Sequence, residues 1–251
     1  MNTNAIIVHK LGGPEEMIWQ EVELSSPKEN EVLIKQTAIG LNFIDTYFRS
    51  GLYPAQLPTP LGMEAAGVIE EIGPGVTEFQ IGDRVAYASA PLGSYAEKRI
   101  FPTNNLVKIP DDISDELAAS IMLKGMTAEY LIRRTFKVES GQTVLFHAAA
   151  GGVGLIACQW LKSIGANVIG TVGSNEKAEL ARANGCEHTI LYKEESFVDK
   201  VKKITNGAGV PVVYDSVGKD TAIQSLDCLS PLGLLVIFGN SSGNAPAIEP
   251  G

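Results

Sequence analysis

The chain has 251 residues, 45% of them hydrophobic, and a formal net charge of −9 with dispersed basic residues. This length allows one large domain or two ordinary ones, and the acidic balance argues against nucleic acid or an anionic membrane as a partner. Three widely spaced cysteines without a CxxC pair, an N-terminus unlike a signal peptide and the lack of a long apolar segment lead us to expect a cytoplasmic protein without disulfides.

The first ~120 residues contain short candidate strands that are interrupted by glycine and proline. Turn signals such as Pro74-Gly75 and Gly82-Asp83 separate them. This pattern is typical of an all-β unit, either a barrel or a sandwich. The expected strands are Ala5–His9, Glu31–Ala38, Ala66–Ile72, Arg84–Ala88 and Ser94–Ile100.

The pattern changes after Pro110. Ser114 is a candidate N-cap for a helix that runs to about Met122, and Thr127–Phe136 is expected to form a second helix. We place the boundary near Lys124, which gives an N-terminal domain of residues 1–123 and a C-terminal domain of residues 124–251.

Strands and helices alternate through the C-terminal half, which predicts a parallel, doubly wound Rossmann sheet. Only thirteen residues follow Phe238. The usual sixth strand has no room there, so we expect a sheet that is incomplete at its C-terminus, in a chain that is either naturally short or truncated. The expected strands are Thr143–Phe146, Asn167–Val172, Thr189–Tyr192, Val210–Ser216 and Leu234–Phe238, and the expected helices are Val153–Ile164, Glu176–Asn184, Ser196–Thr205 and Thr221–Leu229.

The segment Thr143–Gly165 has the order strand, glycine turn, helix that a pyrophosphate site requires. Its spacing is A-x-G-x-x-G, with Ala149, Gly151 and Gly154 at the fixed positions. A turn without β-carbons lets a diphosphate approach the first amides of the helix. In this context the pattern favours dinucleotide binding over a tight turn without a ligand.

The end of the second strand of this domain bears on the choice of nucleotide. Sites selective for NAD carry an acidic residue there, and this chain has Thr171, Val172 and Gly173 instead. Ser174 and Lys177 would suit a 2′-phosphate, so we expect NADP(H) rather than NAD(H). The alternative is that Lys177 is an ordinary solvated surface lysine. The negative charge of nearby Glu176 would repel a 2′-phosphate and argues against NADP(H).

Several longer stretches make the chain similar to the zeta-crystallin-like quinone oxidoreductases, a zinc-independent branch of the medium-chain dehydrogenase/reductase family. The resemblance implies an α/β protein with an N-terminal GroES-like β-barrel domain, a Rossmann domain, an active cleft between them and a homodimer, although the short C-terminus weighs against the dimer. The matching stretches are Asn42–Tyr47, Ser50–Pro54, Leu61–Gly67, Gly82–Val85, Leu145–Gly154, Val213–Gly218 and Phe238–Gly243.

The same resemblance argues against a zinc site. Zinc-dependent relatives carry cysteine, histidine and cysteine ligands where this chain has Asn42, Met63 and approximately Lys124. An amide, a thioether and an ammonium do not form a tetrahedral zinc site. Without a Lewis acid, oxidation of an alcohol is disfavoured, whereas hydride addition to an electrophilic acceptor stays feasible.

The resemblance implies NADPH-dependent reduction of a small quinone. Asn42 and Tyr53 are the candidate catalytic hydrogen-bond donors to the acceptor oxygen, and Tyr53 is also a candidate proton donor. Asp45 is expected to be a structural acceptor and His147 a core histidine. The implied cofactor contacts are Asn42, Phe43, Thr46, Tyr47, Lys124, Thr127, Tyr130, Gly152, Val153, Gly173, Ser174, Lys177, Tyr192, Ser216, Phe238, Gly239, Asn240 and Ser241.

Two other functions stay open at this point. Reduction of α,β-unsaturated carbonyls, such as alkenals or enoyl thioesters, uses the same hydride chemistry. An NADPH-binding protein with little turnover is the third possibility, since the family's C-terminal segment is missing from this sequence.

Overall fold

Antiparallel strands build the N-terminal half of the chain in a computed structural model that describes residues 1–248. A five-stranded sheet has the order β7 (Lys98–Pro102), β3 (Glu31–Gly40), β5 (Glu64–Ile72), β6 (Arg84–Ala88) and β8 (Val107–Lys108). A three-stranded sheet has the order β2 (Met17–Glu23), β1 (Asn2–Val8) and β4 (Thr59–Pro60). A bridge between Ala5 and Ala96 connects β1 with the chain entering β7, in keeping with the expected GroES-like barrel.

The apolar positions of these strands form the core of this unit. Val32, Ile34, Tyr87 and Phe101 are completely buried in one cluster, and the rings of Tyr87 and Phe101 stack at 4.1 Å between centroids. Val32 and Ile34 are two residues apart, as side chains on one face of a strand must be.

Strand β2 and helix α1 (Phe43–Ser50) are the longest of the elements in this half that were not expected from the sequence, which also include the two-residue strands β4 and β8. Strand β2 is mostly exposed on the edge of its sheet, so it lacks the apolar run that marks a buried strand. Helix α1 has only eight residues and is rich in aromatic and β-branched side chains, which have low helix propensity. Short 3₁₀ turns at Pro14–Glu16 and Thr103–Asn105 complete the unit.

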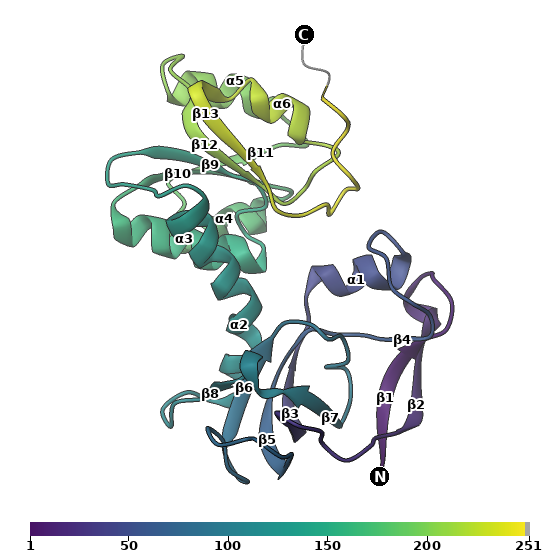
Figure 1. Cartoon of the computed structure of the whole chain (residues 1–251). Helices are drawn as coiled ribbons and strands as arrows, with labels where there is room; N and C mark the ends of the chain where they lie inside the picture. The colour runs from purple at the N-terminus through teal and green to yellow at the C-terminus, as the bar shows by residue number, and fades with distance from the viewer. Residues whose placement is uncertain (249–251) are drawn as a thin grey trace. The chain divides into compact units, whose positions relative to one another are not determined.

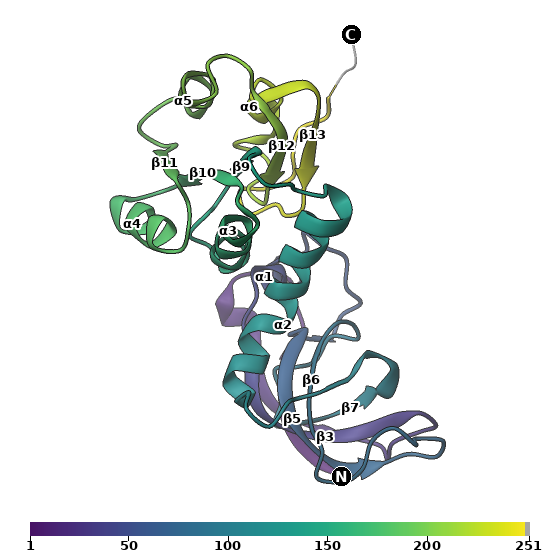
Figure 2. The ribbon, with the colours of Figure 1, turned by 90° about the vertical axis from the view of Figure 1, so that its left-hand side faces the viewer.

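The C-terminal half is the expected parallel sheet with helices on both faces (Figures 1 and 2). Helices α3 (Gly152–Ile164) and α4 (Asn175–Ala183) cover one face, and α5 (Phe197–Ile204) and α6 (Ala222–Leu226) cover the other. The described strands of this sheet, in spatial order, are β11 (His188–Leu191), β10 (Asn167–Val172), β9 (Thr143–Phe146), β12 (Val210–Asp215) and β13 (Leu229–Ile237).

Strand β9 shows why this sheet needs two helical layers. Val144 and Phe146 are buried in the cluster that contains α3, whereas Leu145 is buried in the cluster that contains α5. Alternate side chains therefore point to opposite faces and both faces are apolar, as in parallel sheets generally.

A single helix, α2 (Asp115–Tyr130), replaces the two helices expected around Lys124. One π-helical stretch, Leu131–Thr135, continues it. The expected gap between Met122 and Thr127 was wrong, because the glycine inside it, Gly125, costs a helix only about 1 kcal/mol and packing easily offsets that. The chain divides into two compact units, Met1–Leu123 and Lys124–Gly251.

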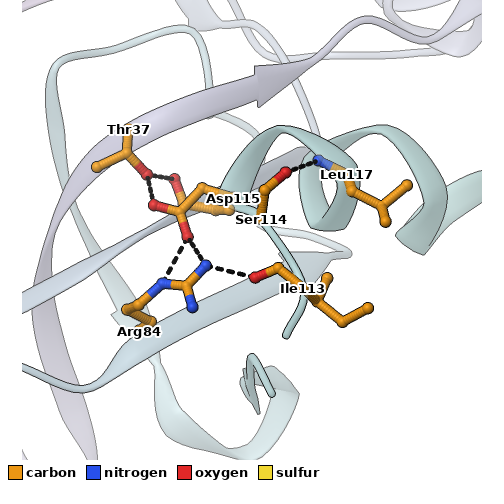
Figure 3. A network of polar contacts seen from close by, with 7 residues as sticks. Thr37, Arg84, Ile113, Ser114, Asp115 and Leu117 are labelled. Carbon is orange, nitrogen blue, oxygen red and sulfur yellow. Dashed lines mark hydrogen bonds and ion pairs between the residues drawn. The ribbon is translucent and has the colours of Figure 1, made fainter. Parts of the chain in front are cut away.

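The first turn of α2 is fixed to the N-terminal unit by a polar network (Figure 3). The Arg84 guanidinium donates to Asp115 Oδ1 from Nε at 2.9 Å and from Nη2 at 2.6 Å. The Thr37 hydroxyl donates to Asp115 Oδ2 at 2.5 Å. The Leu117 amide donates to Ser114 Oγ at 3.2 Å, so Ser114 is the expected N-cap. Strands β3 and β6 thus hold the start of α2.

Among the described residues, none of the helices combines the length and the apolar character needed to cross a bilayer.

We expect the substitution Asp115→Asn to lower the free energy of unfolding at pH 7 by about 1–2 kcal/mol, because it weakens charge-assisted hydrogen bonds in a partly buried network. Burial raises the pKa of Asp115, but the hydrogen bonds from Thr37 and Arg84 outweigh it and the net pKa is lowered. This stabilisation is present above the unfolded pKa, about 3.9, and is lost as pH falls through the folded pKa. Urea denaturation of the full chain between neutral and acidic pH measures it.

The matched control is Asp112→Asn, since Asp112 is exposed in the preceding turn. An equal loss of stability in both variants, or a loss that does not shrink on acidification, would contradict the role of Asp115.

Candidate active site

In the N-terminal unit, Asn42 stands at the N-terminus of α1 and is only 6% exposed. Its amide Nδ2 donates to Glu64 Oε2 at 2.7 Å, and the other oxygen of this carboxylate accepts from the Leu123 amide at 2.8 Å. Glu64 is completely buried on β5. A buried carboxylate requires such donors, so Glu64 fixes the orientation of the Asn42 side chain.

Asp45, one turn further along α1, is the structural acceptor expected from the sequence. Its Oδ2 accepts from the Asn42 backbone amide at 2.9 Å and from the Tyr95 hydroxyl at 2.7 Å. Burial raises the pKa of Tyr95, and so does its hydrogen bond to Asp45, which keeps the phenol neutral. The start of α1 is therefore held by three side chains from three separate segments.

Aromatic packing places Tyr53 against α1. Its ring lies 5.0 Å from that of Tyr47 and 5.7 Å from that of Phe48, and its backbone amide donates to the Tyr47 carbonyl at 3.1 Å. Phe43 is 59% exposed. The Thr46 hydroxyl donates to the Phe43 carbonyl at 2.6 Å, within the helix. The predicted residues Asn42, Phe43, Thr46, Tyr47 and Tyr53 thus form one cluster.

In the C-terminal unit, the turn after β9 leads directly into α3. Ala148 adopts a left-handed conformation with φ +52°, which is uncommon for a residue with a β-carbon. The Ala149 amide donates to the Thr171 carbonyl at 3.1 Å, and the Gly151 amide donates to the Ala148 carbonyl at 2.8 Å. The first-turn amides of α3, at Gly152 and Val153, have no partner within the helix. Together with the helix dipole they suit an anionic ligand.

The glycines of this turn serve two different purposes. A β-carbon on Gly154 would lie 2.5 Å from the Ala148 carbonyl oxygen and 2.6 Å from that of Ala149. A β-carbon on Gly152 would instead lie 2.8 Å from Cδ and 2.9 Å from Cε of Lys124. Gly154 therefore permits the turn itself, whereas Gly152 leaves room for a lysine stem. The Lys124 stem is thereby placed beside the start of α3.

Lys124, Thr127 and Tyr130 are spaced by three residues on α2, so they share one face of that helix.

At the end of β10, Ser174 is the N-cap of α4 and accepts from the Lys177 amide at 3.4 Å. Gly173 faces the side chains of Tyr192 and Lys193, each 3.9 Å from a β-carbon built on it. Lys193 was missed by the sequence analysis. Its only signal was its place directly after Tyr192, and it adds a second cation to the predicted 2′-phosphate position.

Glu176 lies in the same first turn of α4 and is exposed. A hydrogen bond with Ser174 lowers the pKa of this carboxyl, which stays charged at neutral pH. It therefore competes with any phosphate for the Ser174 hydroxyl. This agrees with the sequence analysis, in which the charge of Glu176 argued against a 2′-phosphate at this position.

The backbone segments that follow β12 and β13 lie close together. A β-carbon on Gly239 would lie 2.9 Å from the Ser216 carbonyl oxygen, and that oxygen accepts from the Ser241 amide at 3.1 Å. The ring of Phe238 lies 5.7 Å from that of Phe146 on β9. Asn240 belongs to the same loop. Apart from the three on α2, the predicted residues of this unit thus follow β9, β10, β11, β12 and β13, on the carboxyl edge of the sheet where ligands of such folds gather.

Two family models match the chain. Residues 28–111 match "Alcohol dehydrogenase GroES-like domain", and residues 152–250 match "Zinc-binding dehydrogenase". A quinone oxidoreductase from Pseudomonas aeruginosa is 54% identical over 96% of this chain and 74% of its own length.

The chain belongs to the quinone oxidoreductase family. A 2-haloacrylate reductase from a Burkholderia species is 50% identical over 98% of this chain and 75% of its own length. The solved quinone oxidoreductase of Escherichia coli, in complex with NADPH, is 50% identical with a TM-score of 0.94, over 98% of this chain and 76% of that one. The expectation of NADP(H) as the cofactor agrees with this structure.

The donors at the ligand positions of zinc-dependent relatives do not fit a zinc ion. The Asn42 amide is bonded to Glu64, Met63 offers a thioether, and the Lys124 stem lies over Gly152. Within residues 1–248, no three His, Cys, Asp or Glu side chains are grouped so that they could hold a metal ion. An amide, a thioether and an ammonium are not a set of zinc ligands, whatever the name of the matching family model.

We expect alanine substitutions of Gly154 and Gly152 to cause different defects, one in stability and the other in cofactor affinity. Gly154→Ala forces a methyl group against backbone carbonyls, so we expect a loss of about 1–3 kcal/mol in the free energy of unfolding. Gly152→Ala meets only the flexible Lys124 stem, so we expect near-normal stability and a weaker affinity for NADPH. Thermal unfolding and calorimetric titration of both variants test this. The same defect in both would refute the separation of roles.

Proposed function

We propose that this member of the quinone oxidoreductase family reduces quinones with NADPH by direct hydride transfer and without a metal. The observation that carries the proposal is the glycine turn at the start of α3, with Lys124 beside it and with no acidic residue at the end of β10. These features match what a phosphorylated dinucleotide needs from a protein.

The cofactor would be held by both halves of the chain. Gly152, Val153 and Lys124 would bind the pyrophosphate. Gly173, Ser174, Lys177 and Tyr192 would bind the adenosine phosphate, and the remaining proposed contacts are Asn42, Phe43, Thr46, Tyr47, Thr127, Tyr130, Ser216, Phe238, Gly239, Asn240 and Ser241. Lys193 joins the second group because it lies at Gly173.

When bound, NADPH supplies a hydride from its nicotinamide C4. The chain's own task is to align the acceptor, exclude water and stabilise the negative charge that develops on the acceptor oxygen. The Asn42 amide nitrogen carries two hydrogens, and Glu64 takes one of them. We assign the second hydrogen and the Tyr53 hydroxyl to the acceptor oxygen, with Tyr53 as the proton donor.

A second candidate is the reduction of a conjugated carbonyl compound. It is favoured by the relative that is named a 2-haloacrylate reductase and is 50% identical to this chain. Both acceptors take a hydride at an electron-poor carbon and leave charge on an oxygen, so the same donors serve either substrate. A protein that binds NADPH with little turnover is the remaining alternative.

NADPH oxidation by the purified chain decides among these alternatives. We expect turnover with 1,4-benzoquinone and 9,10-phenanthrenequinone to exceed turnover with an alkenal or 2-chloroacrylate, and NADPH to be preferred over NADH. Faster reduction of the alkenal or the haloacrylate would favour the second candidate. NADPH binding, measured by calorimetry, without oxidation by any acceptor would favour the third.

The catalytic assignment predicts separate effects for two substitutions. Tyr53→Phe keeps the ring contacts with Tyr47 and Phe48, so we expect normal folding and a kcat about tenfold lower. Asn42→Ala removes a charge-stabilising donor and is expected to lower kcat by about 100-fold.

The control is Asn104→Ala, an exposed position in the same unit. Unchanged kcat in Tyr53→Phe and Asn42→Ala, with NADPH still bound, would refute both roles.

We also propose that the protein acts in the cytoplasm on small molecules, without nucleic acid, and forms a homodimer. All three cysteine thiols are free and buried, which suits a reducing compartment. Strand β13 is at one end of its sheet, and Leu232, Leu234 and Ile237 are exposed on it. An exposed apolar edge strand is a surface that another chain can cover, which supports a dimer.

A further inference from the structure

His147, the last residue before the glycine turn, is completely buried between two hydroxyl groups. Its Nδ1 lies 2.8 Å from Thr171 Oγ1 at the end of β10, and its Nε2 lies 2.9 Å from Ser225 Oγ on α6. The centroid of its ring lies 5.0 Å from that of Phe197, and the two rings are nearly perpendicular. The proposed chemistry does not use this residue, although it joins three elements around the cofactor turn.

The partners of the two hydroxyl groups determine which nitrogen carries the hydrogen. Ser225 Oγ donates its one hydrogen to the Thr221 carbonyl at 2.9 Å, so it accepts from Nε2–H of His147. Nδ1 then has no hydrogen and accepts from the Thr171 hydroxyl. Burial lowers the pKa of His147 to about 4, although the charge of Asp215 acts in the opposite direction. The ring is therefore neutral, in the Nε2–H tautomer.

The charge of Asp215 raises the pKa of His147, but both of its carboxylate oxygens accept hydrogen bonds from other groups. Its Oδ1 accepts from the Val217 and Gly218 amides at 2.8 and 3.0 Å, and its Oδ2 accepts from the Thr221 hydroxyl at 2.7 Å. It therefore gives His147 no direct partner that would favour the protonated ring.

Thr171 contacts the glycine turn at two points. Its carbonyl accepts from the Ala149 amide at 3.1 Å, and its hydroxyl donates to His147. These bonds flank Ala148, whose left-handed conformation persists only where its surroundings impose it. Two residues beyond Thr171, the chain reaches Gly173 and Ser174. The position of the glycine turn is thus coupled to the position of that loop.

We propose that neutral His147 is a positioning residue for cofactor selectivity, which fixes Thr171, and through it the Gly173–Ser174 loop, against the glycine turn. The inference rests on the proposed function, because that loop is assigned there to the 2′-phosphate. Only NADPH carries this phosphate, so a displaced loop weakens NADPH binding more than NADH binding.

The direct test compares two substitutions of Thr171 by calorimetric titration with NADPH and NADH. Thr171→Val keeps the shape and removes the donor, and we expect NADPH affinity to fall about fivefold to tenfold more than NADH affinity. Thr171→Ser keeps the donor and is expected to restore the ratio. The control is Thr205→Val, which removes a hydroxyl at the end of α5. Equal losses for both cofactors, or no recovery in Thr171→Ser, would overturn the proposal.

Nitrogen-15 NMR of the full wild-type chain tests the tautomer independently of any variant's folding, and His147→Gln assigns the signals. We expect the Nε2–H pattern, unchanged down to about pH 5. An Nδ1–H ring or an imidazolium at neutral pH would overturn the proposal.

Lys177→Ala separates this inference from the function on which it rests. Selective loss of NADPH affinity in Lys177→Ala, with no selective loss in Thr171→Val, would refute the coupling alone. If Lys177→Ala leaves NADPH affinity unchanged, the 2′-phosphate assignment falls, and the selectivity role of His147 falls with it.

Discussion

The close approach between the backbone of α3 and the end of β9 is the constraint on which the cofactor site depends. A β-carbon on Gly154 would lie 2.5 and 2.6 Å from two carbonyl oxygens, so a side chain there would force the backbone to shift. This contact sets where the free amides at the start of α3 lie relative to the sheet. Everything proposed for the pyrophosphate, including the place of Lys124, follows from that geometry.

In each unit, buried polar groups hold the residues proposed for function through hydrogen bonds within that unit. In the N-terminal unit the Glu64 carboxylate orients Asn42, and Asp45 holds the start of α1. In the C-terminal unit the neutral ring of His147 and the Asp215 carboxylate fix the ends of β9, β10 and β12. Such buried hydrogen bonds resist displacement, because breaking one of them costs the desolvation of a buried group.

The side chains expected at the zinc-ligand positions of zinc-dependent relatives do not suit zinc in this chain. Asn42 and, approximately, Lys124 stand where such relatives are expected to carry thiolates, and both are engaged in contacts of their own. An acceptor that is already electrophilic needs orientation and hydrogen-bond donors more than a Lewis acid. Quinones and conjugated carbonyls both meet this condition. The choice between them depends on the shape of the acceptor site, which the chemistry of the donors does not set.

Local patterns in the sequence determined the alternating C-terminal half, the glycine turn, the N-cap at Ser114 and the missing acid after β10. These features depend on residues that are close together in the sequence, because strand periodicity, glycine placement and helix capping are local patterns. Tertiary structure alone decided that α2 runs unbroken through Gly125, that Phe43–Ser50 is helical and that Lys193 lies beside Gly173. It also decided that Glu64 holds Asn42 and that Thr171 and Ser225 fix His147. Such contacts join residues far apart in the chain, and their energies override local preference only once the sheets and helices have packed.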